Sequence, residues 1–190
     1  EERVVRAAEE ALASGNDLLC NDLVYRAFER GLRTPALAWL RVQSLASAGN
    51  TVLARRQFDE LAPAPWQRDA RRFPLLGRLE KDLGLRAGAS ARQHFLTAAE
   101  SYLQAWQLKP DSYPAINAAT LFLLAGDREQ SMHWAQQALR LASATQLSDE
   151  AERYFLHATI AEASLLLGDE AGLRQALAAA NQLLPGDYLR

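Results

Sequence analysis

The residues of this sequence that could do chemistry are its three histidines and its single cysteine. His94, His133 and His157 stand in separate segments, and none has a cysteine, an aspartate or a second histidine at the spacing of metal ligands. Cys20 occupies a position where small apolar residues recur, so we expect a packed side chain rather than a nucleophile or a ligand. These residues predict no catalytic residue, no metal and no cofactor.

Two pairs of adjacent carboxylates, Glu9-Glu10 and Asp149-Glu150, are the remaining candidates for acid and base chemistry. Neighbouring residues on a helix do not face each other, so we expect these pairs to be solvated or to lie near helix N-termini, where negative charge is favourable. The glycine-containing segment LGLRAG, residues 83–88, lacks the lysine and serine of a phosphate-binding loop. We therefore expect a protein that is not an enzyme.

Glycines that recur at intervals of 34, 35, 42 and 42 residues mark the elements that carry these side chains. Each closes one helical segment and opens another; they are Gly15, Gly49, Gly84, Gly126 and Gly168. Apolar residues recur at three- and four-residue spacings, without the alternation of a half-buried strand. Such a period is typical of stacked helix-turn-helix repeats. The sequence predicts an all-α fold, a right-handed α-α superhelix of the tetratricopeptide (TPR) type with about ten helices.

Clusters of turn residues mark the ends of the expected helices. They lie at residues 15–17, 34–35, 49–51, 63–65, 88–90, 110–112, 126–127 and 168–169. Two segments, LRAGASARQHFLT after Gly84 and LASATQLSDE at residues 141–150, are longer than the repeat requires. No Gly/Ser/Pro-rich linker divides the chain, so we expect one domain over residues 1–190. Its approximate repeats are residues 1–34, 35–66, 67–110, 111–150 and 151–190.

The charge balance limits the kinds of partner. The 21 lysines and arginines nearly equal the 23 aspartates and glutamates, so the net charge of −2 provides no general attraction to nucleic acid or an anionic membrane. No apolar run approaches the roughly 18 to 20 residues that span a bilayer. The charged start EERVVRAAEEAL is unlike a signal peptide and indicates a fragment of a longer protein. Because a single cysteine excludes an internal disulfide framework, we expect a cytoplasmic protein.

Partial matches to the TPR pattern W-x2-L-G-x2-Y occur in several units, and the third unit matches best. Its matching residues are Phe73, Leu76, Gly77, Ala98, Tyr102, Ala105 and Pro110. Alanine or glycine at these positions allows two helices to cross closely.

Two short motifs are more specific than the general repeat. The segment LLGRLEKDLG, residues 75–84, contains the series Gly-Arg-x-x-Lys-Asp, and residues 110–127 contain Tyr-x-x-Ile-Asn-x-Ala. With the insertion between them, these motifs resemble the TRAFs-binding, TPR-like regulatory domain of apoptosis signal-regulating kinases. Bacterial proteins carry the same domain, and residues 31–61 are similar to the early repeats of these bacterial members. The resemblance implies a regulatory scaffold for partner proteins or adjacent signalling domains, but fold and family do not identify the partner.

In a TPR-type array the first helix of each repeat lines a concave groove. The register places ten residues there: Trp39, Gln43, Arg71, Arg78, Lys81, Tyr113, Asn117, Thr120, Phe155 and Glu162. Aromatic side chains provide desolvated anchors and arginines offer paired hydrogen bonds, so this strip fits a protein or peptide partner with acidic residues. Only Asn117 falls on the lysine-asparagine clamp by which chaperone adaptors bind a terminal carboxylate, so we disfavour a chaperone tail.

Several cationic and aromatic residues have a structural alternative. Arg78, Lys81 and Asp82 could instead form ion pairs within their helix or between repeats, and Arg78 and Asp82 stand four residues apart, which suits a pair within a helix. The basic run of Arg68, Arg71 and Arg72 could contact an acidic peptide, or it could form a solvated face. Three tryptophans lie outside the groove: Trp66, Trp106 and Trp134. We expect them to pack in the core or between repeats. If two of them clustered on the exposed surface, they would instead indicate a dimer contact.

The predicted function is a non-catalytic protein-interaction domain that regulates a signalling protein by binding a partner peptide or an adjacent effector domain through its groove. One alternative is a structural assembly module of an envelope or secretion system, in which convex surfaces self-associate. Another is the accessory domain of an enzyme whose catalytic part lies outside this sequence. The sequence leaves the identity of the partner and the oligomeric state open.

Overall fold

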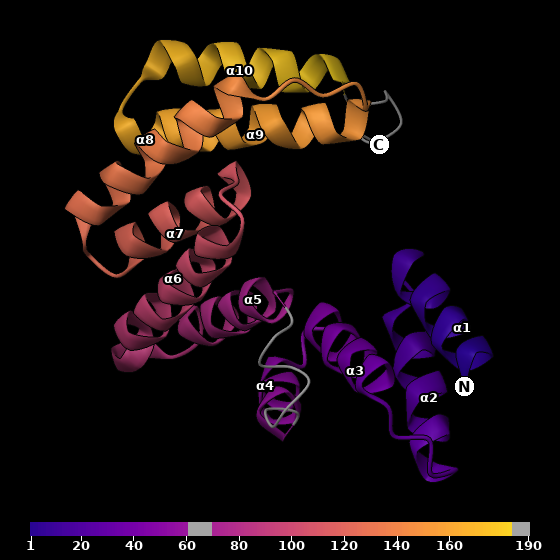
Figure 1. The fold of residues 1–190 in the computed structure, drawn as a ribbon. Coiled ribbons are helices and arrows are strands. Elements are labelled where there is room, and N and C mark those ends of the chain that lie inside the picture. The colour runs from indigo at the N-terminus through magenta and orange to yellow at the C-terminus, as the bar shows by residue number, and fades with distance from the viewer. Residues whose placement is uncertain (61–69, 184–190) are drawn as a thin grey trace. The chain divides into compact units, whose positions relative to one another are not determined.

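The structure is a computed structural model that describes residues 1–60 and 70–183 (Figure 1). These residues form ten α-helices and one short 3₁₀ helix, with no strand among them, so the predicted all-α fold is confirmed. The predicted turn at residues 63–65 lies outside the described residues, as do Trp66 and Arg68. The chain divides into two compact units, Glu1–Arg86 (unit 1) and Ala87–Arg190 (unit 2). The five predicted repeat boundaries stay a prediction.

The described residues of unit 1, 1–60 and 70–86, form five helices. They are α1 (Glu2–Ala13), α2 (Asp17–Glu29), α3 (Pro35–Ser47), α4 (Thr51–Glu60) and α5 (Arg72–Gly84). The turns have clear local causes: Gly15 and Gly49 adopt left-handed φ angles of 73° and 78°, which residues with a side chain rarely adopt. Asn16 and Thr34 cap the next helices by accepting hydrogen bonds from the backbone N–H groups three residues later.

Two apolar clusters form the core of unit 1. One joins α1, α2 and α3 through its buried residues, which are Ala8, Ala11, Cys20, Val24, Ala27, Leu37 and Leu40. The other joins α3, α4 and α5; its buried residues are Trp39, Val42, Leu45, Ala46, Ala54, Leu75 and Leu79. α3 contributes to both clusters, which explains why eight of its thirteen residues are buried.

Unit 2 contains the other helices. They are the 3₁₀ helix η2 (Gly88–Ser90) and the α-helices α6 (Ala91–Leu108), α7 (Ser112–Leu124), α8 (Arg128–Ala144), α9 (Glu150–Leu167) and α10 (Glu170–Leu183). Aspartates cap four of these helices through their side chains: Asp111 for α7, Asp127 for α8, Asp149 for α9 and Asp169 for α10. The Asp149-Glu150 pair thus marks a helix N-terminus, as the sequence indicated.

Small residues dominate the core of unit 2. Ala115, Ala119, Ala135, Ala138 and Ala163 are fully buried where α7, α8 and α9 meet. Alanine at such positions allows close helix packing, as the repeat pattern predicts.

Two of the tryptophans pack in the core of unit 2. Trp106 of α6 and Trp134 of α8 meet edge to face, with ring centroids 5.1 Å apart, and both are partly buried against the core. The Nε1 atom of Trp106 is itself buried. The predicted core packing is therefore correct for this pair, and the pair does not form an exposed patch for a dimer contact.

The turn after α5 differs from the others. Gly84 closes α5 as its buried last residue, as expected, but the left-handed φ of 55° belongs to Gly88 in the predicted turn at residues 88–90. Most of the extra residues after Gly84 form η2 and the start of the 18-residue helix α6. In the second long segment, residues 145–149 connect α8 to α9. None of the helices in the described part of the chain is long and apolar enough to cross a membrane.

Candidate functional site

In unit 1, three of the residues predicted for the groove lie on a pocket of about 320 Å³. Its lining residues come from α1 and α3 and from the residue before α5; they are Glu9, Leu12, Ala13, Ala36, Trp39, Leu40, Gln43 and Arg71. Trp39 is only 6% exposed and belongs to the core, so its ring forms a wall of the pocket rather than a protruding anchor. The Arg71 guanidinium carbon lies 5.4 Å from the centre of this ring, a cation–π contact.

The other two predicted cations of unit 1 do not line this pocket. Arg78 is exposed, and its Nη1 atom lies 3.5 Å from Ser47 Oγ at the end of α3, a weak contact. Lys81 is half-buried in the last turn of α5, where a cation is favoured by the helix dipole. Within residues 1–60 and 70–183 no ion pair joins Arg78 to Asp82, so the structural alternative weighed for this pair does not occur.

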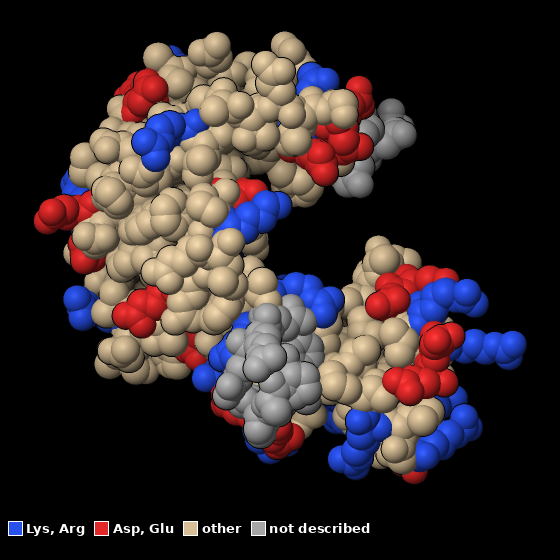
Figure 2. Space-filling model, in the orientation of Figure 1, with Lys and Arg blue, Asp and Glu red and all other residues tan. Residues whose placement is uncertain are grey.

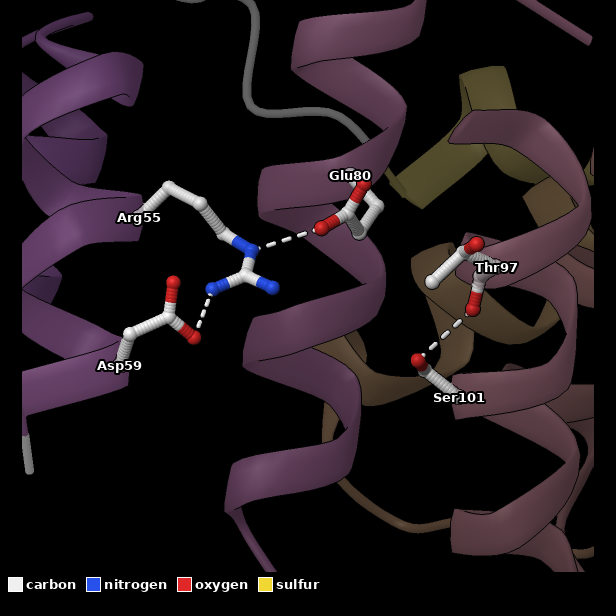
Figure 3. Close-up of polar contacts among 5 residues, drawn as sticks. All are labelled: Arg55, Asp59, Glu80, Thr97 and Ser101. Carbon is white, nitrogen blue, oxygen red and sulfur yellow. Dashed lines mark hydrogen bonds and ion pairs between the residues drawn. The ribbon is translucent and has the colours of Figure 1, made fainter. Parts of the chain in front are cut away.

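Among the described residues of unit 1, Glu80 is the buried charged residue, and no pattern in the sequence pointed to it. Its side chain is 7% exposed and its Oε1 atom accepts a hydrogen bond of 2.6 Å from Arg55 Nε, while Arg55 Nη1 pairs with Asp59 (Figure 3). Burial lowers the pKa of the Arg55 guanidinium. Hydrogen bonds to the Asp59 and Glu80 carboxylates raise this pKa by more than burial lowers it, so the net shift is upward. This contact fixes α4 against α5. The four-residue spacing of Arg55 and Asp59 is a sequence signal for an ion pair within a helix, but nothing in the sequence indicates that Glu80, 25 residues away, is a partner of Arg55.

In unit 2 the strip contains a second pocket, of about 360 Å³, with two predicted residues on it. Tyr113 of α7 is 53% exposed and Phe155 of α9 is 68% exposed. The Tyr113 ring meets the buried Tyr102 ring edge to face at a centroid distance of 5.9 Å, which fixes its position. Two aromatic residues that stand 42 residues apart in sequence therefore converge on one surface.

The remaining predicted residues of unit 2 make contacts within the protein. Asn117 Nδ2 donates a hydrogen bond of 2.9 Å to the Tyr113 carbonyl in its own helix. The Thr120 hydroxyl donates to the Glu162 carboxylate and so joins α7 to α9. None of these three residues lines the second pocket. Of the ten predicted residues, five line one of these two pockets: Trp39, Gln43 and Arg71 in unit 1, and Tyr113 and Phe155 in unit 2.

The residues that could have done chemistry are not arranged as a catalytic or metal site in the described part of the chain. Cys20 is fully buried, and its thiol lies 3.8 Å from the Leu40 carbonyl oxygen. Burial raises the pKa of this thiol; a hydrogen bond with Ser44 lowers it by less, and the negative charge of Asp17 adds to the rise. The thiol is thus held neutral in the core. Within the part of the chain that the structure describes, no group of three histidine, cysteine, aspartate or glutamate residues could hold a metal ion.

Comparisons with known proteins agree with this geometry. Residues 3–122 match the Tetratricopeptide Repeats-Sensor family, and residues 67–188 match the MAP3K TRAFs-binding domain. No curated protein matches the sequence. Among solved structures, the chain is similar to TTC0263, a thermophilic TPR protein in Thermus thermophilus, with a TM-score of 0.75 and 17% identity over 98% of this chain and 93% of that chain. At this identity the similarity shows the fold alone.

Both family matches cover more than half of the chain, and they overlap in residues 67–122, which contain the Gly-Arg-x-x-Lys-Asp motif and most of the Tyr-x-x-Ile-Asn-x-Ala helix. The predicted resemblance is therefore confirmed. Repeat domains of this type are protein-interaction scaffolds and are generally non-catalytic. The chain belongs to the tetratricopeptide-repeat superfamily, and within it to the Tetratricopeptide Repeats-Sensor and MAP3K TRAFs-binding domain families.

Proposed function

We propose that this chain is a non-catalytic regulatory scaffold that binds a partner peptide, or an adjacent effector domain of its own protein, through the strip on its first helices. The observation that carries the proposal is the convergence of Tyr113 and Phe155 on one pocket. Large aromatic side chains that are more than half exposed are costly to leave in water and supply much of the energy at protein interfaces. The parent would be a cytoplasmic signalling protein of bacterial type, as the resemblance implies.

The pocket of unit 1 is proposed to receive an acidic side chain of the partner. Arg71 offers a guanidinium above the Trp39 ring, and an arginine held in this way can form paired hydrogen bonds with a carboxylate. Gln43 adds an amide on the same pocket, while Glu9 limits the positive charge there. Neither nucleic acid nor membrane is proposed as a partner, because the charges of both signs are interspersed over α1 and α2 (Figure 2).

Selection of displayed random peptides against the purified chain tests the proposal, followed by calorimetry with the selected peptides. Replacing both exposed aromatics, Tyr113→Ala with Phe155→Ala, is expected to weaken binding about thirtyfold or more, since such anchors contribute about 1 to 2 kcal/mol each. The matched control is Leu165→Ala with Leu177→Ala, two exposed apolar residues of α9 and α10 away from the pocket. Recovery of no specific peptide, or equal losses in both double variants, would overturn the proposal.

A further inference from the structure

The second pocket is built partly by the connection between α8 and α9, which is longer than the repeat requires. The end of α8 and this connection supply Leu141, Thr145 and Leu147. The start of α7 and the residues before it supply Pro110, Asp111, Ser112 and Tyr113, and α9 supplies Glu152, Phe155, Leu156 and Thr159. The extra residues of the sequence at 141–150 therefore form one wall of a pocket that a minimal repeat would lack.

The interior of this pocket is apolar. Three half-buried leucines, Leu141, Leu147 and Leu156, line it together with the exposed rings of Tyr113 and Phe155. The volume of about 360 Å³ is at the lower end of the range for ligand sites, which suits one large side chain better than a whole cofactor. An apolar side chain that entered the pocket would be removed from water by the leucines and would contact both rings. It would therefore be held by burial and by aromatic contacts.

The charge on the rim is negative. Among the residues that line the pocket, Asp111 and Glu152 are the ionisable acids, and no lysine, arginine or histidine is present. Both are exposed. Asp111 Oδ1 accepts the Tyr113 backbone N–H at 3.0 Å, and the Glu152 carboxylate makes no ion pair or hydrogen bond to another described side chain.

Neighbouring residues strengthen this negative charge. Asp149 and Glu150 begin α9, and Figure 2 shows acidic side chains gathered at this end of the helix. Lys109 and Arg153 are the nearest cations in sequence, and neither lines the pocket. Most of the face of unit 2 in this view is uncharged, so the acidic rim is a local feature (Figure 2).

We propose that this pocket binds a large apolar side chain of a partner peptide together with a lysine or arginine next to it. The apolar group enters between Tyr113 and Phe155, and the cation pairs with Glu152 and Asp111 on the rim. This rests on the proposed peptide-binding function and makes it specific: at the pocket of unit 2 the partner is basic and apolar, which differs from the acidic side chain proposed for unit 1.

Three synthetic peptides of equal length test the charge and the apolar anchor. The first has a phenylalanine between two lysines in a glycine-serine background, the second has glutamates in place of the lysines, and the third has serine in place of the phenylalanine. Each is titrated into the ¹⁵N-labelled chain, because nuclear magnetic resonance measures weak affinities and locates the bound surface. At about 0.05 M salt the first peptide is expected to bind about five- to tenfold tighter than either of the others, a difference that two exposed ion pairs permit. At about 0.5 M salt the difference in affinity between the first and the second peptide should largely disappear, because salt screens these ion pairs.

Variants of the chain identify the groups responsible. Glu152→Gln with Asp111→Asn removes the rim charges and keeps the helix cap, and it should abolish the preference for lysine. Its control is Glu129→Gln, another exposed acid in the first turn of a helix, away from the pocket. Phe155→Ala should weaken binding of the first peptide about tenfold, while Leu165→Ala, which removes a similarly exposed side chain of the same helix, should not.

The outcomes separate this inference from the proposed function. Equal or tighter binding of the glutamate peptide, or shifts confined to residues outside 110–113 and 141–159, would overturn the inference and leave peptide binding by the chain intact. If none of the three peptides shifts any resonance while peptides selected from random libraries bind, the basic-apolar preference is wrong. If neither set binds, both proposals fail.

Discussion

Replacing Glu80 by glutamine tests whether the buried contact between α4 and α5 holds unit 1 together. The substitution keeps the size of the side chain and removes its charge. Arg55 would then retain Asp59, an exposed partner, while its own side chain is only 27% exposed. A guanidinium that is largely removed from water would thus lose the negative charge that compensates for its burial, and the hydrogen bond of 2.6 Å would at best be replaced by a weaker one to the amide oxygen.

The magnitude follows from the burial of the two partners. Breaking a fully buried ion pair by removing one partner costs about 3 to 5 kcal/mol, and a single hydrogen bond to a charged group contributes about 1.5 to 3 kcal/mol. Because Arg55 is partly exposed and keeps Asp59, we expect the lower range, about 2 kcal/mol in the free energy of unfolding. Urea denaturation followed by circular dichroism measures this value as a fall in the midpoint at constant slope.

A matched control comes from α1 of the same unit. Glu10 pairs with Arg6 at 3.8 Å, with both side chains about three-quarters exposed. Glu10→Gln should therefore change the free energy of unfolding by no more than about 0.5 kcal/mol. Equal effects of Glu80→Gln and Glu10→Gln would refute the reasoning. A double-mutant cycle with Arg55→Met adds a second criterion, because a coupling near zero would show that the two side chains do not stabilise each other.

Three further predictions concern the caps, the turns and the cysteine. Asp149→Ala should destabilise unit 2 by about 1 kcal/mol while Asp149→Ser has little effect, measured by urea denaturation, because serine retains an N-cap oxygen for the Glu152 backbone N–H. Gly126→Ala should cost about 1 to 2 kcal/mol in the same assay, although open space surrounds the site, because φ there is 82°. Cys20 should react slowly with an alkylating reagent near pH 8. Since the folded-state pKa of its thiol is raised, the stability it contributes is complete below the unfolded pKa and is lost as pH rises through the folded pKa; Cys20→Ala should remove that part of the pH dependence.

The elements of this fold were readable from sequence because their ends depend on local chemistry. Gly49 needs a left-handed backbone in the turn before α4, and Pro35 fits the first turn of α3 after its Thr34 cap. Gly84 shows the limit of the same reasoning. Its spacing matched the other glycines and it ends helix α5, but the left-handed φ belongs to Gly88 in the predicted turn at residues 88–90, because the longer connection separates the helix end from that turn.

Side-chain exposure along the strip was less predictable than position. Trp39 and Tyr113 were assigned to the same surface, yet one is 6% and the other 53% exposed. The register fixes the direction of a side chain from its own helix; it does not fix what covers the side chain. Arg71 lies over Trp39, whereas Tyr113 packs on Tyr102 with one edge and leaves much of its ring in water. Contacts of this kind join distant segments and have no short-range signal.

The near-zero charge of the whole chain also conceals local differences that bear on partner choice. A net charge of −2 indicates no long-range attraction to any partner, but the pocket of unit 1 contains Arg71 and that of unit 2 contains Asp111 and Glu152 without a cation. Exposed charges farther apart than the screening length of about 8 Å act nearly independently in physiological salt. Under the proposed function, selectivity at each pocket would therefore depend on the few charges on its own rim, and the total charge of a partner would matter little.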